Sequence, residues 1–318
     1  MTDMTFAVRV AAIRDVAHDV RLFELVAEGE APLPSFVAGA HIDVILGEGM
    51  IRQYSLLNAP DELHRYVIAV AREADGRGGS AHMHDALSIG DSLRVSAPRC
   101  HFGLVEAAPN SVLIAGGIGI TPIWCMIQRL IAIGASWELH YAARTRTHAA
   151  LLDDIERGSA DTGRVRTYFN LEGDPLMDLR QIVAGAPSGS HFYCCGPLPL
   201  LEAYRAACTT VSENQVHFEQ FAAAAPAALD GGYEIELARS GKTLAVAPGE
   251  SILDALRGAG LSASYSCREG ICGSCETAVL GGTPDHRDAI LTDAERAEGR
   301  TMMICCSGSL SPRLILDL

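Results

Sequence analysis

The chain has 318 residues, of which 48% are hydrophobic and 20% charged, a composition typical of a globular protein with two or three domains. Its net charge of −14 argues against nucleic-acid binding, because contacts to phosphates need clustered lysine and arginine. No run of about 18 apolar residues predicts a membrane span, and no basic segment followed by an apolar one predicts a secretory signal, so we expect a cytoplasmic protein.

Short strands are predicted throughout residues 1–105. The stretch "FAVRVAAIRDVAHDVRLFELVA" alternates apolar and polar residues and breaks near Asp15 to Asp19. The segments "AHIDVILG", "RYVIAVARE" and "DSLRVSAP" continue this pattern and are separated by glycine, proline and acidic residues. Many short strands at this spacing favour an antiparallel barrel.

One of these strands, "RQYSL" (52–56), carries groups that suit a nucleotide-like cofactor. Strand alternation puts Arg52 and Tyr54 on one face and Ser55 on the other. An arginine can hold a phosphate through paired hydrogen bonds, and a tyrosine can lie flat against a ring system. The same residues also fit an ordinary edge strand, so this pattern alone does not establish a cofactor site.

The loop "GRGGS" (76–80) lies between a predicted strand and a predicted helix. Gly78 and Gly79 let the backbone approach an anion, and Ser80 is expected to cap the helix and donate to a phosphate. His82 and His84 fall on this helix, where we expect a surface role rather than metal binding.

The stretch "SVLIAGGIGITPIWCMIQRLIAIGASWELHYAART" predicts a strand, a glycine turn, a helix and a second strand. Residues 106–225 are therefore expected to form an α/β domain with a parallel sheet. The turn departs from the G-x-G-x-x-G pattern, yet its glycines allow a pyrophosphate to approach a helix N-terminus. Thr121 is expected to cap that helix, with Pro122 in its first turn.

The C-terminal part follows an alanine-rich stretch (221–232) that we interpret as a linker. Beyond it, Cys267, Cys272 and Cys275 have the spacing C-x4-C-x2-C, and Cys305 and Cys306 follow after 29 further residues. This spacing is typical of a plant-type [2Fe–2S] site. A structural zinc site usually pairs two C-x2-C knuckles, and a redox pair needs no third or fourth cysteine.

Residues 233–318 resemble a plant-type ferredoxin domain, through "SYSCREGICGSCETAVLGGTPDHRD" and "SPRLILDL". With "RQYSL", "GGIGITP" and "CGP", the whole chain resembles the phthalate dioxygenase reductase and vanillate demethylase reductase family. The resemblance implies an antiparallel β-barrel flavin domain (1–105), an α/β nucleotide-binding domain (106–225) and an α+β β-grasp ferredoxin domain (226–318). It also selects the cluster ligands Cys267, Cys272, Cys275 and Cys305.

The resemblance further implies FMN rather than FAD, because the ferredoxin part is C-terminal, and NADH rather than NADPH, although Arg144 or Arg146 could meet a 2′-phosphate. Ser55 and Cys195 are expected at the site of hydride transfer. The flavin is expected to contact Arg52, Gln53, Tyr54, Ser55, Ala69, Val70, Arg72, Gly78, Gly79, Ser80 and Phe221. The nicotinamide nucleotide is expected to contact Gly116, Gly117, Gly119, Thr121, Pro122, Cys195, Gly196 and Pro197.

The function that follows is electron transfer. NADH would deliver two electrons to the flavin, and the [2Fe–2S] cluster would pass them singly to a Rieske-type aromatic oxygenase. Two alternatives stay open from the residues: a stand-alone flavin reductase serving another acceptor, and a redox-sensing protein with zinc at the cysteines.

Overall fold

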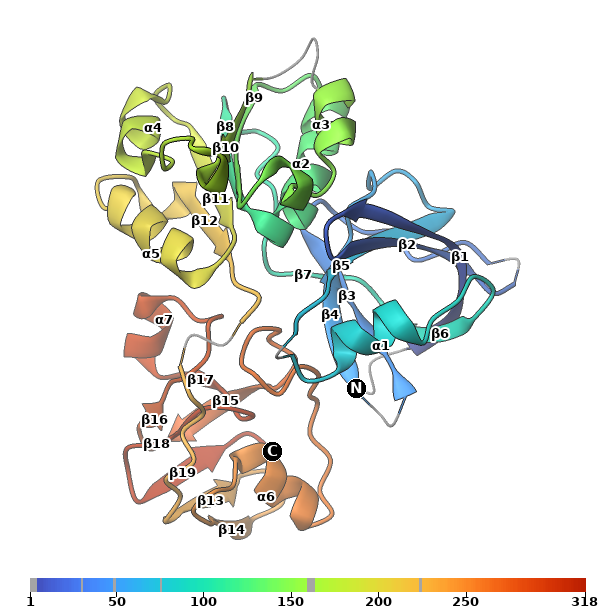
Figure 1. The fold of residues 1–318 in the computed structure, drawn as a ribbon. Helices are drawn as coiled ribbons and strands as arrows, with labels where there is room; N and C mark the ends of the chain where they lie inside the picture. Colours follow the sequence, from blue (N-terminus) through green and yellow to red (C-terminus); the bar gives the residue numbers. More distant parts are fainter. Residues whose placement is uncertain (1–4, 30, 48–49, 75, 159–163, 223–224) are drawn as a thin grey trace. The chain divides into compact units, whose positions relative to one another are not determined.

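The computed structural model describes residues 5–29, 31–47, 50–74, 76–158, 164–222 and 225–318. The chain forms two compact units, the first ending at Gln220 and the second running from Phe221 to the C-terminus. The first unit contains two sheets and the second unit one large and one small sheet (Figure 1). The expected boundaries at residues 105 and 225 stay predictions. Among the described residues, no helix combines the length and the apolar character that crossing a bilayer requires.

The first sheet is antiparallel and has seven strands in the order β4-β3-β6-β1-β2-β5, with β7 paired to β3. The end strands β4 and β5 contact each other, and Leu57 N–H donates to Val67 O (2.9 Å) directly after β4. The sheet therefore curls into a barrel, as the alternating pattern predicts. Its strands are β1 (Thr5–Ala17), β2 (Val20–Ala27), β3 (Ala40–Ile45), β4 (Ile51–Ser55), β5 (Arg65–Ala71), β6 (Ser92–Ser96) and β7 (Arg99–Cys100), and helix α1 (Gly79–Asp85) follows β5.

The second sheet is parallel, in the order β10-β9-β8-β11-β12. Its central strand β8 is buried along its whole length, as expected of a strand covered by helices on both faces. The chain runs outward from β8 to β10 and then from β11 to β12, so the direction reverses between β8 and β11. The elements are β8 (Ser111–Gly116), α2 (Ile120–Ala132), β9 (Trp137–Ala143), α3 (Leu152–Gly158), β10 (Arg164–Phe169), α4 (Leu179–Gly185), β11 (His191–Cys195), α5 (Leu198–Ala207) and β12 (Val216–Glu219).

The second unit has a mixed sheet in the order β14-β13-β19-β15-β17 and a two-stranded sheet of β16 and β18. Ser251 caps α6 by accepting a hydrogen bond from Asp254 N–H (3.1 Å). The cysteine loop (267–275) lies between α6 and β15. The elements are β13 (Tyr233–Leu237), β14 (Lys242–Val246), α6 (Ile252–Gly258), β15 (Glu276–Gly281), β16 (Pro284–Asp285), α7 (Asp293–Glu298), β17 (Thr301–Met303), β18 (Gly308–Ser309) and β19 (Arg313–Leu316).

Part of the stretch interpreted as a linker belongs to the second unit. Ala228 is buried and its N–H donates to Cys306 O (2.7 Å). Leu229 O accepts from Gly249 N–H (2.8 Å). These bonds fix residues 228 and 229 to turns of the second unit, whereas residues 223 and 224 of the stretch lie outside the described part of the chain.

Candidate functional site

The Arg52 side chain of β4 lies against the glycine loop that precedes α1. The Arg52 guanidinium lies along Gly79, at which a Cβ would come within 2.3 Å of Arg52 Nε, and it donates to Arg77 O (2.7 Å). Gly78 caps the helix with φ +79°, a conformation that glycine adopts without strain. The fold thus brings Arg52, Gly78 and Gly79 together, and this arrangement suits a cofactor phosphate.

Other residues of this region have roles that the sequence did not indicate. The Ser80 hydroxyl accepts from Glu73 N–H (3.1 Å) and Gly78 takes the cap position, so the expectation that Ser80 caps the helix is wrong. The Arg72 guanidinium forms a bidentate ion pair with Asp85 (2.6 and 2.8 Å), so its contact with the flavin stays a prediction.

The expected surface role of His84 is also wrong. His84 is only 8% exposed, and its Nε2 lies 2.9 Å from Val70 O. Ala69 and Val70 are buried in β5, so any contact they make with a flavin must come from their backbone groups.

The remaining polar side chains of β4 also have defined neighbours. Gln53 donates to Asp43 (2.9 Å), whose buried carboxylate also accepts from Arg99 (2.6 Å). Burial raises the pKa of Tyr54, so its phenol keeps its proton. Tyr54 is half-buried and can present a neutral ring face to a flat cofactor.

Ser55, Cys195 and Glu219 come together from three different strands. Cys195 of β11 pairs in register with Glu219 of β12, and the Glu219 carboxylate accepts a hydrogen bond from the Ser55 side chain. Glu219 as a whole is partly exposed, but its Oε2 is buried and has no hydrogen-bond partner. Burial raises the pKa of Glu219 to about 8, and burial followed by the charge of Glu219 raises the pKa of the Cys195 thiol.

The glycine turn after β8 and the "CGP" turn after β11 contact each other. A Cβ at Gly119 would come within 2.2 Å of Cys195 O, and one at Gly196 within 3.1 Å of Gly116 Cα. Both turns lie at the carboxyl ends of the two strands between which the sheet order reverses, the place where open α/β sheets bind nucleotides. The two motifs therefore lie together at the place where the nicotinamide nucleotide is expected, and its binding there stays a prediction.

Within that site, Thr121 lies one residue inside the helix. Helix α2 begins at Ile120 with Gly119 at its cap position, and the Thr121 hydroxyl donates to Ile118 O (3.0 Å). The expectation that Thr121 caps α2 is therefore wrong, while Pro122 lies in the first turn as predicted. Gly117 has φ +54°, and the Cβ that a substitution would add at Gly116 would meet Pro197 and Leu200 at 2.8 Å.

Replacing Gly119 with alanine is expected to raise the KM for NADH by about tenfold or more, since a misplacement of about 1 Å costs up to roughly 100-fold. The new methyl group would displace the Cys195–Gly196 peptide and open the contact between the two turns. Steady-state kinetics with ferricyanide as acceptor measure this effect. Gly185→Ala is the matched control, because a Cβ there meets nothing within 4 Å; an unchanged KM in Gly119→Ala would contradict the assigned site.

The four predicted cluster cysteines are buried together in the second unit, each at most 5% exposed. Hydrogen bonds between side chains link Cys267 with Cys272 and with Cys305, and Cys275 with Cys305. Among the described residues, no three side chains of the metal-binding types are arranged to hold a single metal ion. The four thiols form one continuous group through these contacts, and a [2Fe–2S] cluster takes four cysteine sulfurs, two on each iron.

Backbone N–H groups of the loop point at these sulfurs. Glu269 N–H donates to Cys267 Sγ (3.3 Å), and Cys267 N–H donates to Cys272 Sγ (3.4 Å). The pKa of Cys272 is raised mainly by its hydrogen bond with Cys267 and secondly by burial. The pKa of Cys275 is raised mainly by its hydrogen bond with Cys305 and secondly by burial. Iron cations would offset this penalty on the thiolates, and N–H donors to sulfur are the usual setting of such a cluster. The residues present therefore fit a [2Fe–2S] cluster.

Cys306 stands apart from the four thiols. Its Sγ contacts Met303 O (3.7 Å) and lies below Gly270, at which a Cβ would meet it at 2.5 Å. The geometry thus favours Cys305 over Cys306 as the fourth ligand. Arg268, inside the cysteine loop, forms an ion pair with Asp254 of α6.

Two family models match the chain. The model "Oxidoreductase FAD-binding domain" matches residues 7–103, and "2Fe-2S iron-sulfur cluster binding domain" matches residues 235–308. The phenoxybenzoate dioxygenase subunit beta of Ectopseudomonas oleovorans is 54% identical, over 98% of this chain and 97% of that protein. The tetrachlorobenzoquinone reductase of Sphingobium chlorophenolicum is 47% identical, over 99% of this chain and 98% of that protein.

Among solved structures, phthalate dioxygenase reductase is 37% identical, with a TM-score of 0.74, over 99% of this chain and 98% of that one. The chain belongs to the phthalate dioxygenase reductase family. Members of this family are oxidoreductases with a flavin domain and a [2Fe–2S] domain. The family resemblance and the three-part fold predicted from the sequence are therefore confirmed.

Glu219 belongs to the candidate functional site, but the sequence patterns did not indicate it. It lies in "HFEQF", two residues before Phe221, and an acidic residue on a short parallel strand next to a "CGP" turn is the signal that could have found it. Phe221 is 39% exposed and opens the second unit, so its place over the flavin stays a prediction.

Proposed function

We propose that this chain is the NADH-dependent reductase component of a two-component Rieske-type aromatic oxygenase, with FMN and a [2Fe–2S] cluster bound by Cys267, Cys272, Cys275 and Cys305. The observation that carries the proposal is the position of Glu219 between Ser55 of the flavin domain and Cys195 of the nucleotide site. A flavin takes two electrons from a nicotinamide and releases them one at a time. A site where these residues meet is suited to bring the two ring systems together.

In the proposed reaction, the protein binds and orients. The Arg52 guanidinium and the N–H groups at Gly78 and Gly79 would hold the phosphate of FMN, whereas Ser55 would face the reactive edge of its ring. Cys195 would lie against the nicotinamide as a neutral thiol, because burial raises its pKa. Glu219 holds the Ser55 hydroxyl in place, and its raised pKa of about 8 lets its carboxylate gain or lose a proton near neutral pH.

The preference for NADH is supported by the charges after β9, where the ribose of a bound nucleotide would lie. The Arg146 guanidinium pairs with Glu156 (3.1 Å) and stacks on Phe169 (5.3 Å to the ring centre). Its backbone N–H donates to Glu172 (2.7 Å). Two carboxylates beside Arg146 would repel a 2′-phosphate at this arginine, so NADPH is expected to bind more weakly than NADH, although the side chain of Arg144 is exposed.

An oxygenase partner is supported by the relatives, among them the phenoxybenzoate dioxygenase subunit beta. The net charge of −14 suits docking on a basic surface, which salt would weaken. The aromatic substrate would bind to that partner.

The test mixes the purified full chain with candidate oxygenase components and aromatic acids, phenoxybenzoate first. Consumption of NADH and formation of product should both require the oxygenase and the substrate, and NADPH should replace NADH poorly. The flavin released by denaturation should have the mass of FMN. Release of FAD would overturn the proposed FMN, and equal rates with NADPH would overturn the proposed preference for NADH. If NADH consumption couples to no Rieske oxygenase, the proposed partner is wrong.

A second candidate function is the reduction of a quinone, which the similarity to the tetrachlorobenzoquinone reductase favours. A quinone can take two electrons, so its reduction does not need a one-electron carrier. The variant Cys305→Ser separates the two functions: quinone reduction at the flavin would survive it, and support of an oxygenase would not.

A further inference from the structure

A charge pair of a buried aspartate and a partly exposed arginine, Asp288 and Arg296, lies next to the loop that carries the cluster cysteines. Gly270, inside that loop, has φ +72°, and a Cβ there would come within 2.9 Å of Asp288 Cα. The N–H of Ala289 donates to Gly270 O (2.9 Å). The segment around Asp288 therefore packs directly against the loop between Cys267 and Cys272.

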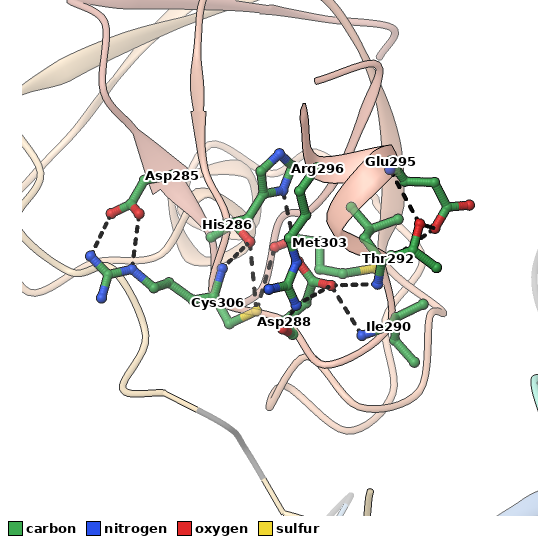
Figure 2. Close-up of polar contacts among 12 residues, drawn as sticks. Asp285, His286, Asp288, Ile290, Thr292, Glu295, Arg296, Met303 and Cys306 are labelled. Atoms are coloured by element: carbon green, nitrogen blue, oxygen red, sulfur yellow. Dashed lines mark hydrogen bonds and ion pairs between the residues drawn. The ribbon is translucent and has the colours of Figure 1, made fainter. Parts of the chain in front are cut away.

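The Asp288 carboxylate is fully removed from solvent, with 0% of its side chain exposed. Its Oδ2 accepts from the N–H group of Ile290 (3.1 Å), as Figure 2 shows, and from that of Leu291 (2.8 Å). Arg296 of α7 reaches the same group, with Nη2 at 3.8 Å from Oδ2 and a hydrogen bond to Asp288 O. These donors stabilise a negative charge on Asp288, and Arg296 is always positive.

The titratable groups next to Asp288 and Arg296 do not neutralise either of them. His286 Nδ1 lies 3.8 Å from Asp288 Oδ1, and burial lowers the pKa of His286, so its ring is neutral near pH 7. Asp285 and Arg287 neutralise each other in a bidentate pair (3.0 and 2.8 Å) that is partly exposed. Asp288 and Arg296 thus place one carboxylate and one guanidinium next to the loop.

We propose that Asp288 and Arg296 are positioning residues of the iron–sulfur site that tune its reduction potential with charges of opposite sign. The inference rests on the proposed ligand set. Reduction adds one negative charge to the cluster, which a nearby carboxylate disfavours and a nearby guanidinium favours. Asp288 is fully buried, so water and salt screen its charge weakly, whereas the side chain of Arg296 is one-third exposed (33%) and is screened more. Asp288 also fixes the turn that presents the Ala289 N–H to Gly270.

The test is a redox titration of the full chain, followed by visible absorption and by the paramagnetic signal of the reduced cluster. Asp288→Asn keeps an oxygen that can accept the same two N–H groups but removes the charge. It is expected to raise the potential of the cluster by about 59 mV, a tenfold shift of a one-electron equilibrium. Arg296→Gln is expected to lower the potential by a similar amount, and Arg296→Lys to leave it near the wild-type value.

Asp317→Asn is the matched control, because Asp317 forms an exposed pair with Arg239 (2.7 Å) and its loss should leave the potential unchanged. Shifts of equal sign in Asp288→Asn and Arg296→Gln, or an unchanged potential in Arg296→Gln, would overturn the inference. If Asp288→Asn does not keep its cluster, the inference is tested by the difference in reduction potential between Arg296→Gln and Arg296→Lys. A wild-type protein without a reducible [2Fe–2S] signal would overturn the proposed ligand set, and this inference with it.

Discussion

Replacing Cys305 with serine is expected to remove the [2Fe–2S] signal and to abolish electron transfer to an oxygenase, while NADH-dependent reduction of ferricyanide at the flavin continues. The Cys305 thiol lies among the sulfurs of Cys267 and Cys275, and a serine hydroxyl is a poor substitute for a soft thiolate ligand. The loss should exceed the roughly 10–100-fold that removal of an outer partner costs. Visible absorption, iron and sulfide content, and the two activities measure it.

Cys306→Ser is the matched control for this experiment. Cys306 is the next residue in the chain and equally buried, but its sulfur contacts Met303 O rather than the other thiols. We expect this variant to keep its cluster and its transfer to the oxygenase. Loss of the cluster in Cys306→Ser and its retention in Cys305→Ser would reverse the assignment of the fourth ligand.

Replacing Glu219 with glutamine is expected to remove a pH dependence from the reduction of the flavin by NADH. In the wild type, Glu219 loses its proton near pH 8. The resulting negative charge beside Ser55 and Cys195 opposes the arrival of electrons. The wild-type rate should therefore fall by about tenfold between pH 7 and 9, corresponding to an electrostatic cost of about 1.4 kcal/mol. Glu219→Gln is neutral throughout and should show a flat profile in stopped-flow measurements.

The same variant has a second readout in the free energy of unfolding. Burial raises the pKa of Glu219 from 4.5 to about 8, so between these values the folded state keeps a proton that the unfolded state has lost. Stability should fall as the pH rises through this window and level off above it. Glu219→Gln should lose that slope, and Glu213→Gln, an exposed residue before the same strand, should keep it. A wild-type slope in Glu219→Gln would contradict the assigned pKa.

The order of the domains along the chain could be predicted from the sequence because each domain has its own local pattern. The short alternating strands of residues 1–105, the glycine turn after Ala115 and the cysteine spacing after Ser266 each follow from neighbouring residues in one segment. Local spacing determines backbone conformation and which side of an element a residue faces. The glycines of the two nucleotide turns could be recognised for the same reason, since only glycine allows such close approach.

Details of capping and pairing depended on neighbours that local patterns do not reveal. Ser80 and Thr121 are good cap residues by type, yet each hydroxyl binds another backbone group, and glycines take the cap positions of both helices. Arg72 pairs with Asp85 across a loop, and His84 turns inward to Val70 O. In each case a contact within the folded unit competes with the local preference and wins.

The sequence by itself determined the fold class, the order of the three parts and the cysteines that could bind a cluster, because ligands and turns of this kind lie close together in the chain. Only the tertiary structure placed Glu219 against Ser55, separated Cys306 from the four neighbouring thiols and buried Asp288 beside Arg296 next to the cluster loop. Charge and proton affinity depend on burial and on groups brought in from distant strands, and sheet pairing and packing in the folded unit set these surroundings.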